Sequence, residues 1–321
     1  MNINLNRWAA ALALSLAAGA ALAQAYPDKP IRFVVGFPPG GGNDIIARLV
    51  AAKMQEGLGQ PVVIDNKPGA NSIIATEFVA KAPADGYTLL VNATGGMSMN
   101  PVLYAKLPYD SLKDFAAISL LADFPMVMAV HPSVPANNVR ELIAYAKANA
   151  GKLNYSSGSS SFQVAMEMFN QMAGTDIRHI PFKGSAASAT AVLANTTQVT
   201  IIDTPAVVSQ INAGRLRALA VTTTKRVPSM ADIPTLDEAG VPGYDMLLWT
   251  GLFAPAGTPA AIVAKLAAEA RRIMQLPDVR EKIAAMGSQS IGSTPAELTE
   301  TIKRQQAAYG PVVKARGIQV E

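Results

Sequence analysis

Short apolar segments alternate with amphipathic helical patterns along most of this chain of 321 residues. Residues 31–36 form an apolar run typical of a strand, and residues 44–58 place apolar side chains at the spacing of one helix face. The same pair of patterns recurs over residues 61–82 and again over 154–194. Strands and helices that alternate in this way favour sheets covered by helices, an α/β fold.

The order of the later elements predicts two lobes. An apolar stretch, 116–130, holds two strands separated at Asp123-Phe124-Pro125, and another strand over 246–254 follows a proline-rich segment. We expect the chain to leave the first lobe near 125 and to return near 249, which gives two crossover strands. Open α/β sheets bind ligands at the carboxyl ends of their strands, so a cleft between the lobes is the expected site.

Three helical patterns, 259–275, 279–286 and 295–315, end the chain without a strand of their own between them. We expect these helices to cover the sheet that is built earlier, the N-terminal one. The sequence therefore predicts residues 26–125 plus 249–321 as lobe 1 and residues 126–248 as lobe 2, each a sheet flanked by helices.

The N-terminal segment 1–25 is typical of a secretory signal peptide. Arg7 is followed by an apolar stretch from Trp8 to Leu22, and small residues allow cleavage near Ala23 or Ala25. The alternative is an uncleaved membrane anchor, but the apolar stretch is shorter than the ~20 residues that span a bilayer. We expect the mature protein to be exported and soluble.

The composition excludes several classes of function. The chain has no cysteine, which suits an oxidising compartment and excludes thiol catalysis and cysteine-based metal sites. Its formal charge is +4, and the basic residues are scattered without a run that resembles a nucleic-acid patch. We expect a small-molecule ligand, no nucleic-acid partner, no cofactor and a monomer.

A glycine-rich loop follows the first strand. Phe37-Pro38-Pro39 leads into Gly40-Gly41-Gly42-Asn43, after which the first helix begins. Backbone N–H groups at a helix N-terminus bind anions, and glycines let a ligand approach them closely. The loop lacks the Gly-Lys-Ser/Thr of a nucleotide P-loop and the GxGxxG spacing of a dinucleotide site. It suits a small carboxylate, although such a turn can also be purely structural.

Two further polar loops follow predicted strands. Residues 94–98, Thr94-Gly95-Gly96-Met97-Ser98, offer hydroxyls and a flexible backbone, and residues 155–161 hold a cluster of serines before a helix. These serines can simply cap the helix and form a turn, but one serine suffices as a cap. A loop of this kind in each lobe could grip the opposite ends of an extended dianion.

Two acidic residues and two aromatic residues near these loops have alternative roles. Asp203 ends a predicted strand, where it can cap the next helix, orient loop amides or a water, or accept from a ligand amine or hydroxyl. Asp44 is expected to support the glycine loop and to pair with Arg48 four residues on. Phe37 and Trp249 are candidate walls of the cleft, and Trp249 is an equal candidate for the core.

The sequence offers little for catalysis. Its two histidines, His131 and His179, fall at or inside strands and are expected to be structural or exposed. No GxSxG elbow precedes a helix, and no HExxH or carboxylate cluster suggests a metal site. A secreted serine hydrolase that uses the serine cluster is the competing class, and we expect no enzymatic activity.

The whole mature chain resembles the Bug receptors, the extracytoplasmic solute-binding proteins of the tripartite tricarboxylate transporter (TctC-like) family. The stretches that carry the resemblance include Tyr26-Pro27-Asp28-Lys29-Pro30, Phe37–Asp44, Pro83-Ala84-Asp85-Gly86-Tyr87, Pro181-Phe182-Lys183-Gly184-Ser185 and Gly251-Leu252-Phe253-Ala254-Pro255.

The resemblance implies a periplasmic Venus-flytrap protein, type II-like, that closes on a small organic mono- or dicarboxylate. Such a protein would pass its ligand to the membrane subunits of a transporter or, alternatively, present it to a sensor protein. In the family, the loops matching Phe37–Asp44 and the segment near 155 close over a ligand carboxylate, and the acid matching Asp203 helps to position bridging waters.

The sequence departs from the family pattern in the second lobe's loops and in one segment of the first lobe. The segment Ser156–Ser161 is shorter than usual, Gln163 stands where members often have histidine, and Asn71-Ser72-Ile73 replaces a Gly-Gly-Asn pattern. Taken together, the loops and the resemblance predict a metal-free ligand site. Its expected residues are Phe37, Gly40, Gly41, Gly42, Asn43, Thr94, Gly95, Ser98, Ser157, Ser159, Ser160, Ser161, Gln163 and Asp203.

Overall fold

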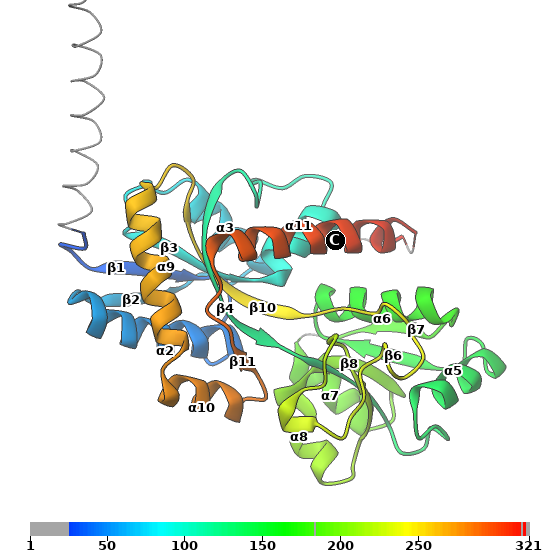
Figure 1. Cartoon of the computed structure of the whole chain (residues 1–321). Coiled ribbons are helices and arrows are strands. Elements are labelled where there is room, and N and C mark those ends of the chain that lie inside the picture. Colours follow the sequence, from blue (N-terminus) through cyan, green and yellow to red (C-terminus); the bar gives the residue numbers. More distant parts are fainter. Residues whose placement is uncertain (1–25, 183, 316, 319–321) are drawn as a thin grey trace, which may run out of the picture.

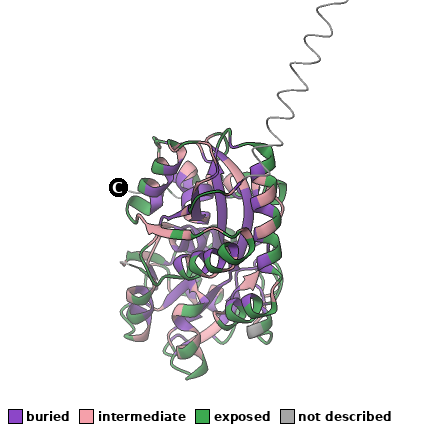
Figure 2. Cartoon of the chain, turned by 90° about the vertical axis from the view of Figure 1, so that its left-hand side faces the viewer, coloured by how far each residue is buried: buried purple, intermediate pink, exposed green. Residues whose placement is uncertain are grey.

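The computed structural model describes residues 26–182, 184–315 and 317–318 (Figure 1). The predicted signal peptide, residues 1–25, lies outside the described residues. Two sheets with helices on their faces make up the described chain, and Figure 2 shows the buried residues gathered on the strands between more exposed helices.

The first sheet has six strands in the order β11-β4-β10-β3-β1-β2. Strand β1 runs parallel to both of its neighbours, β2 and β3, whereas β10 runs antiparallel to β3 and β4. The strands are β1 (Ile31–Val35), β2 (Val62–Asn66), β3 (Thr88–Ala93), β4 (Phe115–Phe124), β10 (Leu248–Pro255) and β11 (Gln289–Ser290). The helical segments of this part are α2 (Gly42–Leu58), η1 (Ala70–Ser72), α3 (Ile73–Ala80), η2 (Gly95–Met99), α4 (Asn100–Leu103), α9 (Ala260–Met274) and α10 (Pro277–Ala285).

The second sheet has five strands in the order β7-β6-β8-β5-β9. Its strands are β5 (Met126–Val130), β6 (Asn154–Ser157), β7 (Arg178–Pro181), β8 (Val199–Asp203) and β9 (Arg217–Val221). The helical segments of this part are α5 (Val139–Ala148), α6 (Ser160–Ala173), α7 (Ser185–Leu193), α8 (Thr204–Asn212) and η3 (Pro228–Met230). Asn138 caps α5 by accepting from the Glu141 N–H at 2.9 Å.

The chain passes between the two sheets twice. Pro125 separates β4 of the first sheet from β5 of the second, because proline cannot donate to a strand ladder. The chain returns in β10, where Leu248 pairs with Phe124 beside this first crossing. The predicted α/β fold with two sheets and two crossovers is confirmed.

The C-terminal part differs from expectation in two ways. A two-residue strand, β11, stands between α10 and the last helix, where no strand was expected, and it pairs with Asp123 and Ala122 of β4. Two residues are too few to produce an alternating pattern, so sequence periodicity could not reveal this strand.

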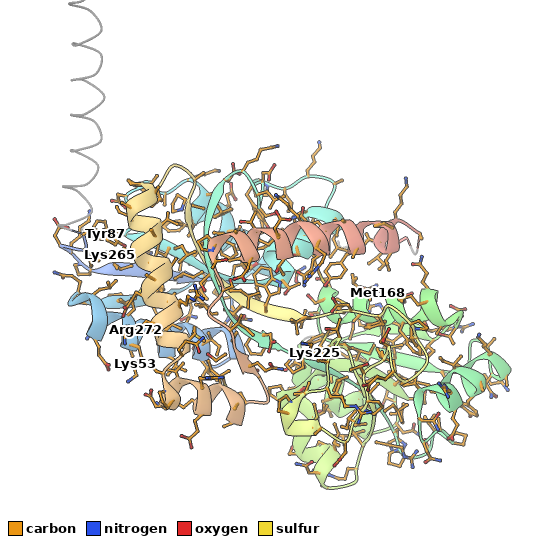
Figure 3. The ribbon with its side chains drawn as sticks, in the orientation of Figure 1. Lys53, Tyr87, Met168, Lys225, Lys265 and Arg272 are labelled. Atoms are coloured by element: carbon orange, nitrogen blue, oxygen red, sulfur yellow. The ribbon has the colours of Figure 1, made fainter. Side chains whose placement is uncertain are left out.

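The last helix, α11 (Pro295–Ala315), covers more than the first sheet. Its first half packs Leu298 and Ile302 against Trp249, whereas its second half places Tyr309 and Val313 in the core cluster of the second sheet. Figure 1 shows α11 extending from the first sheet to a position beside α6, and Figure 3 labels Met168 of α6 near this contact. Since α11 has 21 residues and a helix rises ~1.5 Å per residue, it is long enough to reach both cores.

No helix in the described ranges has both the length and the apolar content needed to cross a membrane. Three clusters of buried apolar side chains form the interior, one of them centred on the second sheet and two on opposite faces of the first. The loops at the carboxyl ends of β1 and β3 therefore extend from the clusters of the first sheet, and those of β6 and β8 from the cluster of the second sheet.

Candidate functional site

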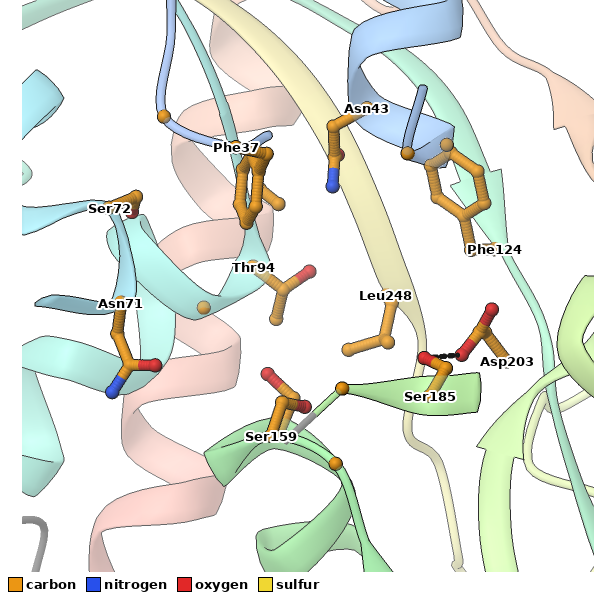
Figure 4. A pocket seen from close by; sticks show the side chains of 18 of the residues that line it. Phe37, Asn43, Asn71, Ser72, Thr94, Phe124, Ser159, Ser185, Asp203 and Leu248 are labelled. Atoms are coloured by element: carbon orange, nitrogen blue, oxygen red, sulfur yellow. Dashed lines mark hydrogen bonds between the residues drawn. The ribbon is translucent and has the colours of Figure 1, made fainter. Parts of the chain in front are cut away.

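A cavity of about 710 Å³ lies between the loops of the two sheets. Its wall on the first sheet comes from the loop after β1, the η1 segment, the end of β3 and the crossing strands β4 and β10. Its wall on the second sheet comes from the loops before α6, α7 and α8 (Figure 4). The cavity therefore occupies the place that the sequence predicts for the cleft.

Five helices begin at this cavity. The N-cap residues of α2, α3, α6, α7 and α8 all line it: Gly41, Ser72, Ser159, Gly184 and Asp203. The first N–H groups of a helix have no partner within the helix, and the dipole places about half a positive charge at that end. The cavity thus gathers the positive ends of helices from both lobes at one point.

The positive potential comes from the backbone. No lysine, arginine or histidine occurs among the described residues that line the cavity, and Asp203 is the one carboxylate there. Side-chain capping of the helix ends is also sparse: of the five N-caps, only Ser159 accepts a capping hydrogen bond from its own helix within the described chain. An anion in the cavity can therefore bind backbone N–H groups that no side chain competes for.

Asp44 holds the glycine loop at the start of α2. Its buried carboxylate accepts from the Gly40 N–H, from Nε of Arg48 and from Nδ2 of Asn66, each at 2.8 Å. Burial by itself raises the pKa of Asp44, but the hydrogen bonds from Arg48, Gly40 and Asn66 outweigh it and hold this pKa below its ordinary value. The prediction that Asp44 supports the loop and pairs with Arg48 is confirmed.

The glycine at the first position of α2 allows the crossing strand to close on the helix. A Cβ at Gly42 would stand 3.0 Å from Cε1 of Phe124. The ring of Phe124 and the ring of Phe37 both face the cavity in Figure 4, and Leu248 of β10 lies below them. The middle of the cavity is therefore apolar, while its edges carry the helix ends.

The serines at the start of α6 have two different roles. The Ser159 hydroxyl accepts from the Phe162 N–H at 3.4 Å and caps the helix. Ser160 and Ser161 line the cavity, and their hydroxyls make no hydrogen bond within the described part of the chain. One serine suffices as the cap, so the other two hydroxyls are open to a ligand.

Asp203 does not cap α8 with its side chain. Its Oδ1 instead accepts from the Ser185 hydroxyl at 2.5 Å, which joins the starts of α7 and α8 (Figure 4). Burial raises the pKa of Asp203, and the hydrogen bond from Ser185 lowers it in part. The backbone N–H of Asp203 also hydrogen-bonds to this carboxylate, and Ser185 is the one side chain recorded as a donor to it in the described ranges.

The structure brings most of the predicted site residues together. Those that line the cavity are Phe37, Gly41, Gly42, Asn43, Thr94, Gly95, Ser159, Ser160, Ser161 and Asp203. Asn43 accepts from the Thr250 hydroxyl, and Thr94 accepts from the Trp249 N–H at 2.9 Å, so both side chains are fixed by β10.

Four predicted residues do not line the cavity. Gly40 lies in the exposed part of the loop, with its N–H turned to Asp44. Ser98 is fully buried in η2, because the π-helical turn rotates it away from the cavity. Ser157 is buried against His179, with 2.6 Å between Oγ and Nε2, and Gln163 lines a separate pocket with Glu167 and His179.

Sequence reasoning missed other residues of the wall, chiefly Ser185, Asn71 and Ser72. Ala70, Asn71 and Ser72 have φ of 45°, 50° and 68°, in the left-handed region that residues other than glycine rarely adopt. Asn100 donates to the Asn71 carbonyl at 2.9 Å and the Asn71 amide donates to the Tyr104 hydroxyl at 2.8 Å, which fixes this turn. The Gly-Gly pattern that Asn71 and Ser72 replace was the signal for it.

Trp249 is part of the core behind the wall. It is fully buried, and its indole Nε1 donates to Oε1 of Gln305 on α11 at 2.8 Å. The core role that the sequence left open for Trp249 is the one the structure shows, although one edge of the residue reaches the cavity.

Both the sequence and the fold are similar to those of known proteins. The model of the tripartite tricarboxylate transporter family receptor matches residues 46–318. Protein BugT of Bordetella pertussis is 33% identical over 302 residues, covering 93% of each chain. The structure of R. palustris Rpa4515 with adipate has a TM-score of 0.81 at 35% identity and covers 92% of this chain and 99% of that one. MatC (Rpa3494) from Rhodopseudomonas palustris with bound malate has a TM-score of 0.78 at 31% identity and covers 90% of this chain and 100% of that one.

Proposed function

The chain belongs to the tripartite tricarboxylate transporter family of receptors, and from this we propose that it is a periplasmic solute-binding receptor for a small organic carboxylate. Its fold is the two-lobed α/β fold of the periplasmic binding proteins in that family. The related structures hold adipate and malate, both of which carry carboxylates.

The observation that carries the proposal is the meeting of five helix N-termini at one cavity. Micromolar binding needs about −8 kcal/mol. Charge-assisted hydrogen bonds contribute roughly 1.5–3 kcal/mol each, so about three to five donors suffice for a carboxylate. The starts of α2 and α6, with the hydroxyls of Ser160 and Ser161, offer that number on opposite walls.

The ligand would bind between two lobes, residues 26–125 plus 249–321 and residues 126–248, with α11 packed on both. Closure of the lobes would add the donors of the second wall to an anion already bound at the first. Phe37, Gly41, Gly42, Asn43, Thr94, Gly95, Ser159, Ser160, Ser161 and Asp203 are the proposed contacts.

The receptor would act without catalysis. Two serine–histidine pairs are recorded among the described residues, Ser157 with His179 and Ser133 with His131, and neither pair lines the cavity. The competing hydrolase function predicts turnover of esters or amides and labelling by serine-reactive probes, with loss of both on replacing Ser159, Ser160 or Ser161.

The proposed partners are the membrane subunits of a tripartite transporter, or a sensor protein in their place. Cleavage of the signal peptide near Ala23 or Ala25 would release the mature receptor into the periplasm. Cell fractionation and N-terminal sequencing of the secreted protein test the location. Ligand uptake in cells with and without the receptor separates transport from sensing.

The binding function is tested by thermal unfolding with a panel of organic acids, after the protein has been unfolded and refolded to remove any ligand carried through purification. At a ligand concentration of 100 times Kd, the stabilisation is expected to be about 2.7 kcal/mol. Gly42→Ala narrows the cavity, because its Cβ would meet Phe124 at 3.0 Å, and it should weaken binding at least tenfold.

The matched control is Gly310→Ala in α11, where the added Cβ would meet only Val102 at an ordinary 3.7 Å. This variant adds the same methyl group away from the cavity and should bind as the wild type does. The absence of stabilisation by every carboxylate in the panel would overturn the proposed function.

A further inference from the structure

Two side chains that line the cavity are hydrogen-bonded to consecutive residues of β10. The Thr250 hydroxyl donates to Oδ1 of Asn43, and the Trp249 N–H donates to Oγ1 of Thr94 at 2.9 Å. Asn43 and Thr94 line the cavity, whereas Thr250 is fully buried and does not line it. Each bond occupies an acceptor atom, so it determines which atoms these two side chains can offer to a ligand.

The bond from Thr250 leaves the donor end of the Asn43 amide open. An amide oxygen accepts hydrogen bonds, whereas the NH2 group donates them. Oδ1 of Asn43 is held by Thr250, and Nδ2 has no recorded partner in the parts of the chain that the structure describes. Figure 4 shows this nitrogen directed into the cavity. Asn43 therefore faces a ligand as a donor.

Thr94 is oriented by the same strand. Its hydroxyl oxygen accepts from the Trp249 N–H, and the O–H itself has no recorded acceptor within the described ranges. A hydroxyl that accepts one hydrogen bond can still donate its own hydrogen. Because Trp249 and Thr250 are adjacent in β10, one short stretch of this strand leaves both Asn43 and Thr94 free to donate.

The start of α2 adds backbone donors beside the Asn43 amide. The first backbone hydrogen bond of this helix runs from the Ile45 N–H to the Gly41 carbonyl at 3.0 Å. The N–H groups of Gly42 and Asn43 precede it, and neither has a recorded partner among the described residues. A negatively charged acceptor, such as a carboxylate oxygen, matches this set of donors best.

Thr250 is a rigid anchor for the amide. It lies inside the first sheet, opposite Ala93 of β3 and Ala122 of β4. Its side chain is β-branched, which restricts its rotation, so the hydroxyl keeps its position. Without this hydroxyl the Asn43 amide could rotate, and its oxygen would repel an anion in the cavity.

We propose that Thr250 is a positioning residue of the binding site: its hydroxyl holds the Asn43 amide with the nitrogen toward the ligand, so that Asn43 donates to a carboxylate oxygen. This inference rests on the proposed function, because the ligand group is the carboxylate of that function. Thr250 does not contact the ligand and affects the affinity through Asn43 alone.

The test of Thr250 removes its hydroxyl and keeps its shape. In Thr250→Val the freed amide must be ordered again on binding, so the affinity should fall about three- to tenfold. Thr250→Ser keeps a hydroxyl and should restore the affinity. The matched control is Thr258→Val, because Thr258 is also buried and donates to the Pro255 carbonyl at 2.8 Å, but it lies outside the cavity. It should bind as the wild type does.

The affinity is measured by calorimetric titration with one probe. The probe is the acid that stabilises the refolded wild type most among acetate, succinate, malate, adipate and benzoate. Asn43→Ala removes the donor and should weaken binding of the probe about tenfold or more. In the Asn43→Ala background, Thr250→Val should have no further effect, because the two residues act through one interaction.

Asn43→Asp tests the direction of the amide. The aspartate has the same shape and can accept from Thr250, but its second oxygen replaces the donor and faces the ligand carboxylate with a like charge. We expect binding of the probe to fall about a hundredfold or more. Asn137→Asp, the same change at an exposed residue outside the cavity, should leave the affinity at the wild-type value.

The outcomes separate the two claims. If no acid of the panel binds the wild type, the proposed function fails. If Thr250→Val binds the probe as tightly as the wild type, or weakens the Asn43→Ala variant further, the inference about Thr250 fails while the receptor function stands. Equal binding by the wild type and Asn43→Asp would also overturn the inference, and this result decides the direction of the amide even where Thr250→Val does not fold.

Discussion

Gly184 donates its backbone N–H to the carbonyl of Gly158 at 3.0 Å, which ties the loop before α6 to the loop before α7. The two backbones are so close that a Cβ on Gly158 would stand 2.3 Å from the carbonyl carbon and oxygen of Gly184. Two of the helix N-termini at the cavity are therefore held as one rigid unit of the second lobe. Under the proposed function, their donors would reach a ligand together.

Gly158→Ala should separate these two loops. Because the obstructing atoms are backbone, the strain cannot be relieved by a side-chain rotation, and overpacking of this kind costs roughly 1–3 kcal/mol. We expect urea unfolding to show that loss in the free energy of unfolding. Calorimetry should show at least tenfold weaker binding of the carboxylate ligand. Gly310→Ala is the control. Unchanged affinity in a destabilised Gly158→Ala protein would show that the two helix ends act independently.

Asp44→Ala should loosen the glycine loop. The change leaves the Gly40 N–H and the Asn66 amide without their acceptor, and we expect a loss of about 2–3 kcal/mol in the free energy of unfolding. Arg48→Ala removes the same ion pair from its half-exposed side and should cost less than about 1 kcal/mol. If both variants lose the same free energy of unfolding, Asp44 stabilises the protein through its ion pair with Arg48 and not through its hydrogen bonds to the glycine loop.

The contribution of Asp44 to the free energy of unfolding also depends on pH. Because its pKa is lowered in the folded protein, its stabilisation is present above the ordinary carboxyl pKa and is lost as the pH falls through the folded value. The wild type should therefore be more stable than Asp44→Ala at pH 7, and this difference in the free energy of unfolding should shrink at pH 3. Unfolding curves at the two pH values measure it. A constant difference between the two proteins would contradict this.

Much of the fold follows from the sequence because hydrophobic periodicity reports on burial. The alternation of strands and helices and the break at Pro125 are local signals, and the structure has both. The loops after β1, β3 and β6 could be found because glycine and serine clusters mark where the backbone must turn. Strand β11, with two residues, carries no such pattern.

The site was only partly predictable because side-chain direction depends on tertiary contacts. Ser157, Ser159 and Ser161 read alike in the sequence, yet Ser157 ends β6 and contacts His179, whereas Ser161 lies in the first turn of α6 and lines the cavity. Ser185 lies 18 residues before Asp203 in the sequence, and no local sequence pattern predicts their hydrogen bond. The meeting of five helix ends is a property of both sheets together.

Asp123 should make the protein less stable as the pH rises. It is buried in β4, accepts from the Gln289 N–H at 3.0 Å, and has no recorded ion pair in the described chain. Burial raises the pKa of Asp123 to about 6. The folded state then keeps a proton that the unfolded state has lost between about pH 4 and pH 6, so the free energy of unfolding falls across that range.

Asp123→Asn should remove this dependence. Two pKa units correspond to about 3 kcal/mol at most, so we expect the variant to be more stable than the wild type by about 1–3 kcal/mol at pH 7.5. At pH 4 the two proteins should unfold at nearly the same urea concentration. A variant that is less stable at both pH values would show that the Asp123 carboxylate is better solvated than its position in β4 implies.

Ser72→Gly should stabilise the protein and weaken ligand binding. Ser72 has a φ of 68°, and its buried hydroxyl has no hydrogen-bond partner in the described structure. A left-handed conformation costs a non-glycine residue roughly 1–2 kcal/mol, and glycine's greater freedom in the unfolded chain offsets about half of the gain. We expect a net gain of about 0.5–1 kcal/mol in the free energy of unfolding. Affinity should fall because the turn before α3 is no longer held in one conformation.

Asn195→Gly is the matched comparison for that trade-off. Asn195 also has a positive φ, 56°, but it lies outside the cavity. Asparagine tolerates this conformation better than serine, so the gain in stability should be smaller, and affinity should stay at the wild-type value. If both variants are more stable and both bind as the wild type does, the left-handed turn at the cavity is structural and does not contribute to ligand binding. If only Ser72→Gly loses affinity, the strained turn belongs to the binding site, and the backbone conformation of residues 70–72 is retained for the ligand at the expense of stability.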